Sequence, residues 1–172
     1  LNDNDFEVHR LMAEVNLSGR NFRVAERHAS KAYKMVPNDP RVLSVYGEVS
    51  LRLGKIDQGL DALKLALEID PIAQGKTNSD SRTAPVIFGE FLARNKDNCL
   101  ELVEKLEDID SKSWLLTAKL CNDEEHDITE EDWYKRGKEE FNDKDWAAEV
   151  DSFRLNNEGA KESLIEFADS LF

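Results

Sequence analysis

Hydrophobic residues recur at spacings of three and four along the first part of the chain, the pattern of amphipathic helices. Two segments carry it, 6–36 and 40–69, and each is interrupted by a short polar break near its middle. Each segment is followed by a proline, Pro37 or Pro71, which cannot continue a helix. The pattern therefore predicts two helical hairpins and an all-α fold.

The two hairpins are also copies of one another. The stretches ASKAYKMVP (29–37) and LKLALEIDP (63–71) place Ala32 opposite Ala66, and the two alanines are 34 residues apart. A hairpin of this kind has an apolar stripe that it cannot bury alone, so neighbouring copies are expected to stack and to need further helices beside them.

Glycines mark where the second hairpin turns and packs. We expect Gly47 to let its two helices approach closely and Gly54 to end the first helix with a positive φ angle. In the first hairpin the glycine of the sequence SGRN, Gly19, lies one position earlier. We therefore expect the first turn to differ from the second.

A third, degenerate hairpin is predicted further along. Residues 72–84 form a polar loop or a poorly formed helix, and Pro85 then lies in the first turn of a helix over 86–95. A partner helix follows over 98–109. Gly89 is expected to repeat the close approach of Gly47, and Asp108 stands where a small residue would be expected. More helices are predicted over 111–121, 132–141, 145–155 and 160–172, the last covering the open end of the array.

Residues 6–71 resemble the tetratricopeptide repeat family, whose 34-residue unit carries Trp-x2-Leu-Gly-x2-Tyr, Ala-x3-Phe and a closing proline. The matching positions include Gly47, Gly54, Gly59, Ala66 and Pro71. The resemblance implies a short right-handed superhelical array of antiparallel helix pairs. It divides the chain into two repeats (1–71), the polar segment (72–84), degenerate repeat-like helices (85–122), and an acidic connector with a divergent C-terminal pair and capping helix (123–172).

In this family the first helices of successive repeats line a concave face that binds a peptide or a helix. The resemblance implies that ten residues of this chain line that face: Arg10, Glu14, Leu17, Arg41, Ser44, Glu48, Leu51, Arg52, Tyr134 and Lys138. Glu14 and Glu48 occupy the places where the carboxylate-clamp members of the family have asparagine. A weaker resemblance, over residues 9–71, is to repeat arrays downstream of bacterial adenylate-cyclase-like catalytic domains, which implies a regulatory part of a larger protein.

Charge narrows the possible partners. The net charge is −13, and residues 72–172 hold 13 Lys and Arg against 25 Asp and Glu. A nucleic acid would be repelled by such a surface, so we expect none as a partner. No apolar run is long enough to cross a bilayer, so no membrane partner is expected either. Cys99 and Cys121 lie in apolar helical patterns, which favours buried thiols and a cytoplasmic protein.

Catalytic motifs are absent from the sequence. It contains no phosphate-binding glycine loop, no Gly-x-Ser-x-Gly and no His-Glu-x-x-His. We expect helix-contact or surface roles for His9 and His28. His126 lies in the acidic segment 122–132, which is a solvated connector or, alternatively, a weak cation site.

The sequence therefore predicts a non-catalytic scaffold or adaptor for protein–protein interaction, with no enzyme activity and no cofactor. Two possibilities stay open beside it. One is a regulatory domain that binds a small ligand or a divalent cation. The other is a homodimer formed through the ends of the array.

Overall fold

The computed structural model describes residues 5–107, and these form helices, turns and loops without a strand. The predicted all-α class is confirmed for this range, and the helices expected beyond residue 107 lie outside it. None of the described helices has the length and hydropathy of a membrane span. The described helices are α1 (Phe6–Ser18), α2 (Phe22–Met35), α3 (Pro40–Arg52), α4 (Ile56–Ile69), α5 (Asp80–Leu92) and α6 (Lys96–Glu104).

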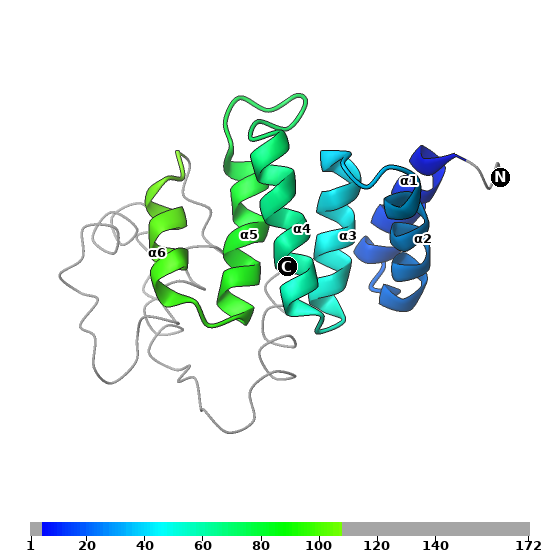
Figure 1. Cartoon of the computed structure of the whole chain (residues 1–172), viewed down its shortest axis with the longest axis horizontal. Helices are drawn as coiled ribbons and strands as arrows, with labels where there is room; N and C mark the ends of the chain where they lie inside the picture. Colours follow the sequence, from blue (N-terminus) through cyan, green and yellow to red (C-terminus); the bar gives the residue numbers. More distant parts are fainter. Residues whose placement is uncertain (1–4, 108–172) are drawn as a thin grey trace, which may run out of the picture. The chain divides into compact units, whose positions relative to one another are not determined.

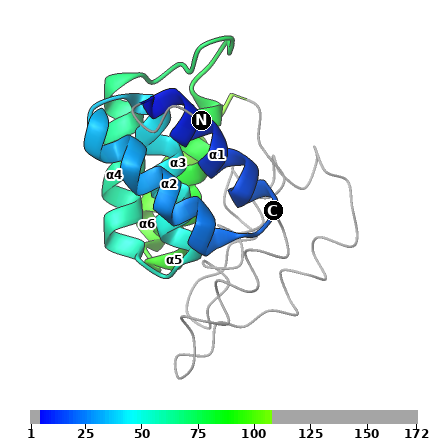
Figure 2. The same ribbon diagram turned by 90° about the vertical axis from the view of Figure 1, so that its right-hand side faces the viewer.

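The chain divides into two compact units, Leu1–Gly89 and Glu90–Phe172, and the boundary falls within α5. In the first unit α1 packs most extensively on α2, and α3 on α4. Helix α3 also contacts both α2 and α1, so the first two hairpins lie side by side (Figures 1 and 2). The predicted packing of consecutive hairpins is therefore present, and the protein is helical and repeat-like.

The same kind of residue starts the first helix of both hairpins. Asp5 accepts a hydrogen bond from the Glu7 backbone N–H at 3.0 Å. Asp39, 34 residues later, accepts from the Arg41 and Val42 backbone N–H groups at 2.9 and 3.3 Å. An aspartate at this position satisfies N–H groups that have no partner within the helix, and it opposes the positive end of the helix dipole.

The hairpin turns share one geometry, so the expectation of a different first turn is wrong. In the second hairpin Gly54 has φ 73° and its N–H bonds to the Leu51 carbonyl. In the first, Arg20 has φ 58° and its N–H bonds to Leu17 in the same way. Gly19 does not take the left-handed conformation. A non-glycine residue tolerates positive φ at a cost, and here the surrounding hydrogen bonds hold it.

The third hairpin repeats this turn, with Arg94 at φ 59° and its N–H bonded to the Phe91 carbonyl. Helices α5 and α6 begin 40 residues after α3 and α4, so six residues have been added in the preceding loop. This offset places Leu106, and not Asp108, at the position of Ala66. Leu106 is buried, so the small residue that was thought to be missing is replaced by a larger apolar one.

Helix α5 begins earlier than the sequence predicted. It starts at Asp80, and Pro85 lies inside it and not in its first turn. The backbone N–H groups of Arg82 and Thr83 both bond to the Ser79 carbonyl, and Asn78 accepts from the Asp80 N–H at 3.2 Å. These polar residues, which suggested a loop, form the helix start. Proline costs one backbone hydrogen bond here, and the apolar residues after it compensate by burial.

Two glycines hold α3 against α4. A Cβ atom on Gly47 would lie 2.6 Å from Leu63 Cγ and 2.8 Å from the Gly59 carbonyl oxygen. Gly89 was expected to repeat this contact, but it lies against the preceding hairpin, where a Cβ would lie 2.8 Å from Leu60 Cδ1. The expectation for Gly89 is therefore wrong, because the 40-residue offset moves it to the position of Val49 in α3.

The interface between the first two hairpins is built from small residues of α2 and branched residues of α3. Its buried cluster contains Ala13, Ala25, Ala29, Val45 and Val49. Tyr33 of α2 stacks on Tyr46 of α3 with ring centroids 4.4 Å apart. Alanines let the two helices approach closely, and the β-branched valines fill the space between them.

Candidate functional site

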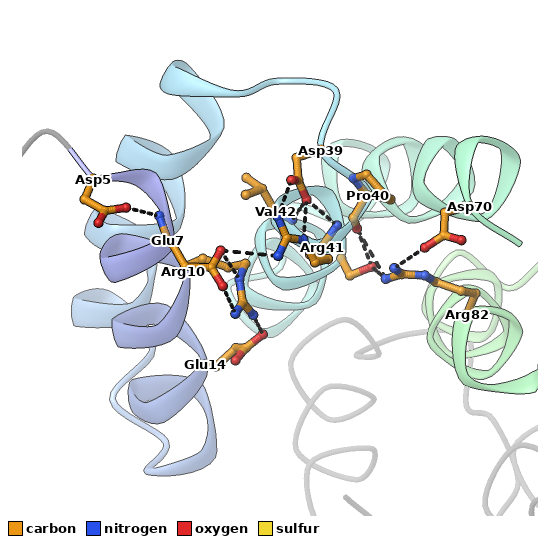
Figure 3. A network of polar contacts seen from close by, with 11 residues as sticks. Asp5, Glu7, Arg10, Glu14, Asp39, Pro40, Arg41, Val42, Asp70 and Arg82 are labelled. Atoms are coloured by element: carbon orange, nitrogen blue, oxygen red, sulfur yellow. Dashed lines mark hydrogen bonds and ion pairs between the residues drawn. The ribbon is translucent and has the colours of Figure 1, made fainter. Parts of the chain in front are cut away.

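The residues predicted to line one face of α1 are paired with each other. Arg10 binds Glu7 through two hydrogen bonds of 2.7 and 3.0 Å, and it also binds Glu14 (Figure 3). These residues are three and four positions apart, so helical geometry brings their side chains together. The bond from Arg10 lowers the pKa of Glu7 below its usual value, and the bond from Glu7 raises the pKa of Arg10.

Arg41 extends this network from α1 to α3. Its guanidinium binds Asp39 at 2.8 and 3.2 Å and lies 3.5 Å from Glu7 (Figure 3). The hydrogen bond from Arg41 holds the pKa of Asp39 below its usual range. Asp39 therefore caps α3 and fixes the arginine that faces α1.

Arg82 connects α5 with α3. Its guanidinium binds Asp70 at 3.1 Å and the Pro40 carbonyl oxygen at 3.3 Å, and it also donates to the Ser44 hydroxyl (Figure 3). Only 9% of its side chain is exposed. A buried arginine is tolerated where its donors meet several acceptors, and Arg82 meets acceptors of three kinds.

Charged and polar side chains thus follow one another from α1 across α3 to α5, all within the first unit. We call this set the inner strip. Its positively charged members are Arg10, Arg41, Arg52 and Arg82, and its other members are Glu7, Glu14, Asp39, Ser44, Glu48 and Asp70.

Glu48 differs from the other carboxylates of the inner strip. It is half-buried in the middle of α3 and senses the charges of Arg52, Arg82 and Glu14. Among residues 5–107 its carboxylate has no hydrogen bond and no cation within ion-pair distance. Burial raises its pKa, against the opposing pull of the two arginines. The other four carboxylates of the strip each have an arginine as an ion-pair partner.

Arg52 lies beside Glu48 and stacks on an aromatic ring. Its guanidinium carbon is 4.2 Å from the centre of the Phe88 ring. Such a cation–π contact fixes the direction of the arginine and covers part of its surface. Arg52 is therefore half-buried between α3 and α5 and is not an extended surface side chain.

Two leucines predicted for the face serve the core instead. Leu51 is fully buried, and its side chain lies against Gly59 of α4. Leu17 is half-buried and packs against the cluster between the first two hairpins. The prediction for Leu51 is wrong, because one helical step separates the strip from the side of α3 that meets α4. Tyr134 and Lys138 lie outside the described residues.

The histidine and cysteine predictions concern the packing of helices. His9 is buried, and its Nδ1 lies 2.9 Å from Nδ1 of His28, which joins α1 to α2. Cys99 is a buried thiol. Residues 5–107 contain no group of three or more side chains that could hold a metal ion. His126, Cys121 and the acidic segment 122–132 lie beyond the described range.

Sequence reasoning missed four residues around the strip: Asp39, Asp70, Arg82 and Phe88. Asp39 carried a signal, since an aspartate before Pro40 is typical of a helix start. Arg82 was missed because its segment looked like a loop. The Ser79-Asp80 pair was the available sign that a helix begins there.

Comparisons with known proteins do not assign the chain. No protein-family model matches it, and a search of curated proteins finds no match. The function is therefore argued from the inner strip itself.

Proposed function

We propose that the protein is a non-catalytic interaction module and that its inner strip binds a peptide or a helix of a partner protein. We further propose that the helix pairs continue as a right-handed array of the tetratricopeptide kind. The contacts of α3 with both α1 and α2 support this arrangement.

One observation carries the proposal: the unpaired carboxylate of Glu48 in the middle of the strip. A half-buried carboxylate without a donor is unfavourable, as its raised pKa indicates. A guest that brings a lysine, an arginine or an amide N–H to this point would supply the missing donor. The desolvated position makes such a bond stronger than the same bond at an exposed site.

The surrounding pairs favour a guest with both signs of charge. Arg41 is 42% exposed and Glu14 is 46% exposed, so each can exchange its present partner for a group on the guest. Both are held in place by neighbours, so little additional ordering is required on binding. The expected guest presents a basic residue to Glu48 and an acidic residue to Arg41.

The test uses the full chain, immobilised and screened against a library of short peptides, followed by titration of the selected peptides. We expect selected peptides to contain lysine or arginine, and we expect Glu48→Gln and Arg41→Gln each to weaken their binding tenfold or more. Matched controls are Glu68→Gln and Arg23→Gln, at exposed positions on α4 and α2. Equal effects of the strip variants and the control variants would contradict the proposal.

A further inference from the structure

A second surface stands out on α1, on apolar residues that the inner strip does not include. Val8, Leu11 and Val15 follow one another at helical spacing. Leu11 is 47% exposed and Val15 is 67% exposed, although both are branched hydrophobic residues. Exposed apolar residues in a row, and not scattered singly, call for an explanation.

The repeat supplies that explanation. The residues 34 positions later in α3 are Val42, Val45 and Val49, and all three are buried. Val45 and Val49 are covered by Ala25 and Ala29 of α2. The same positions are therefore an interface in the second hairpin and an open surface in the first. What covers them in α3 indicates what fits on α1.

We propose that the stripe formed by Val8, Leu11 and Val15 is a docking site for an amphipathic helix that presents small residues, seated as α2 is seated on α3. Alanine or glycine is needed at positions i and i+4 of this helix, as Ala25 and Ala29 are in α2. Leu11 is larger than Val45, which strengthens the need for a small residue opposite it.

The neighbouring position adds a second requirement. Tyr46 of α3 stacks on Tyr33 of α2, and Tyr33 lies eight residues after Ala25. The residue of α1 that corresponds to Tyr46 is Met12, which is half-buried. A methionine sulfur packs well against an aromatic ring. The docked helix is therefore one with small residues at i and i+4 and an aromatic residue at i+8. This inference does not depend on the inner strip.

The test adds such a helix to the full chain. A second copy of residues 5–38 is inserted before Asp5, so that its last residue precedes Asp5 as Asn38 precedes Asp39. Hydrogen exchange of the α1 amides is then compared between the extended and the original chain. We expect exchange in the original α1 to slow tenfold or more. The matched control carries Leu11→Lys and Val15→Lys in the original hairpin, where both residues are exposed, and it should lose this protection.

Three results would overturn the proposal. One is unchanged exchange in the extended chain, or a slowing that the two lysines do not abolish. Another is a dimer of the original chain that Leu11→Lys and Val15→Lys dissociate, because a second copy would then be the occupant. The third is faster α1 exchange when the two lysines are introduced into the original monomer, because another part of the chain would then cover the stripe.

Discussion

Glu48 is the residue whose environment differs most from its sequence context. The sequence places it on a helix face among arginines, which suggests a stable ion pair. In the structure the arginines are occupied elsewhere: Arg82 binds Asp70 and Ser44, and Arg52 stacks on Phe88. Burial therefore outweighs attraction, and the charged form of Glu48 opposes folding.

Replacing Glu48 by Gln is expected to stabilise the protein at neutral pH. The pKa of Glu48 is raised in the folded state, so its penalty is absent below the unfolded pKa and develops as the pH rises through the folded pKa. Each unit of pKa difference corresponds to about 1.4 kcal/mol in the free energy of unfolding. Urea unfolding at several pH values measures this.

The gain from Glu48→Gln should shrink toward zero as the pH falls below about 4, where glutamate is protonated in both states. The exposed variant Glu68→Gln serves as the control and should show no such trend. A loss of stability in Glu48→Gln at pH 7 would contradict the raised pKa. Gained stability together with weakened peptide binding is the combination expected of a functional residue.

Arg20 is held in a conformation that glycine adopts more readily. Arg20→Gly should raise the free energy of unfolding by about 0.5–1 kcal/mol, since relief of left-handed strain exceeds the entropy that glycine adds to the unfolded chain. The reverse change in the second turn, Gly54→Arg, should lower it by about 1 kcal/mol. Chemical denaturation measures both, with Gly19→Ala as the control at negative φ. Opposite signs would mean that the turns are not equivalent.

At the scale of helices, the Gly47–Gly59 contact sets the distance between α3 and α4. Gly47→Ala adds a methyl group 2.8 Å from a backbone oxygen that cannot move alone. Alanine favours a helix by about 1 kcal/mol over glycine, but overpacking against backbone costs more, so we expect a net loss of about 2 kcal/mol.

Gly89→Ala provides the comparison for Gly47→Ala. Its added methyl group meets the end of the Leu60 side chain, which can rotate away, so the net change should be less than about 1 kcal/mol. Thermal unfolding of the two variants measures the difference. A larger loss for Gly89→Ala than for Gly47→Ala would show that the two glycines have been assigned to the wrong contacts.

The sequence predicted the helices of the first two hairpins well, because their apolar spacing and closing prolines are local signals. It failed at Arg20, since nothing in an arginine marks a positive φ angle. It also failed at the start of α5, where Pro85 was a stronger signal than the true start at Asp80. The 40-residue offset of the third hairpin was hidden for the same reason.

The candidate site could be predicted in part. Arg10, Glu14, Arg41, Ser44, Glu48 and Arg52 follow from helical spacing on α1 and α3, and the structure brings them together. Leu51 was misplaced because helical spacing alone does not separate two adjacent sides of a helix. Asp70 and Arg82 could not be found, because they come together only when α5 packs on α3.

On the scale of the first unit, three helices that are far apart in sequence contribute to one polar strip. Glu7 reaches Arg41 between α1 and α3, and Ser44 accepts from Arg82 between α3 and α5. Stacked hairpins give this result without any residue being specialised for catalysis, because the first helix of each hairpin faces the same side. The strip is therefore a property of the stacking, and a guest bound there would contact successive hairpins.

A photo-crosslinking measurement tests this account most directly. A benzophenone amino acid replaces Glu14 on the strip in one full-length variant and Arg23, which is 85% exposed on α2, in another. Each variant is irradiated with a peptide selected on the unmodified protein. The account predicts a crosslink from position 14 that excess unlabelled peptide abolishes, and none from position 23. A crosslink from position 23 with none from position 14 would contradict it.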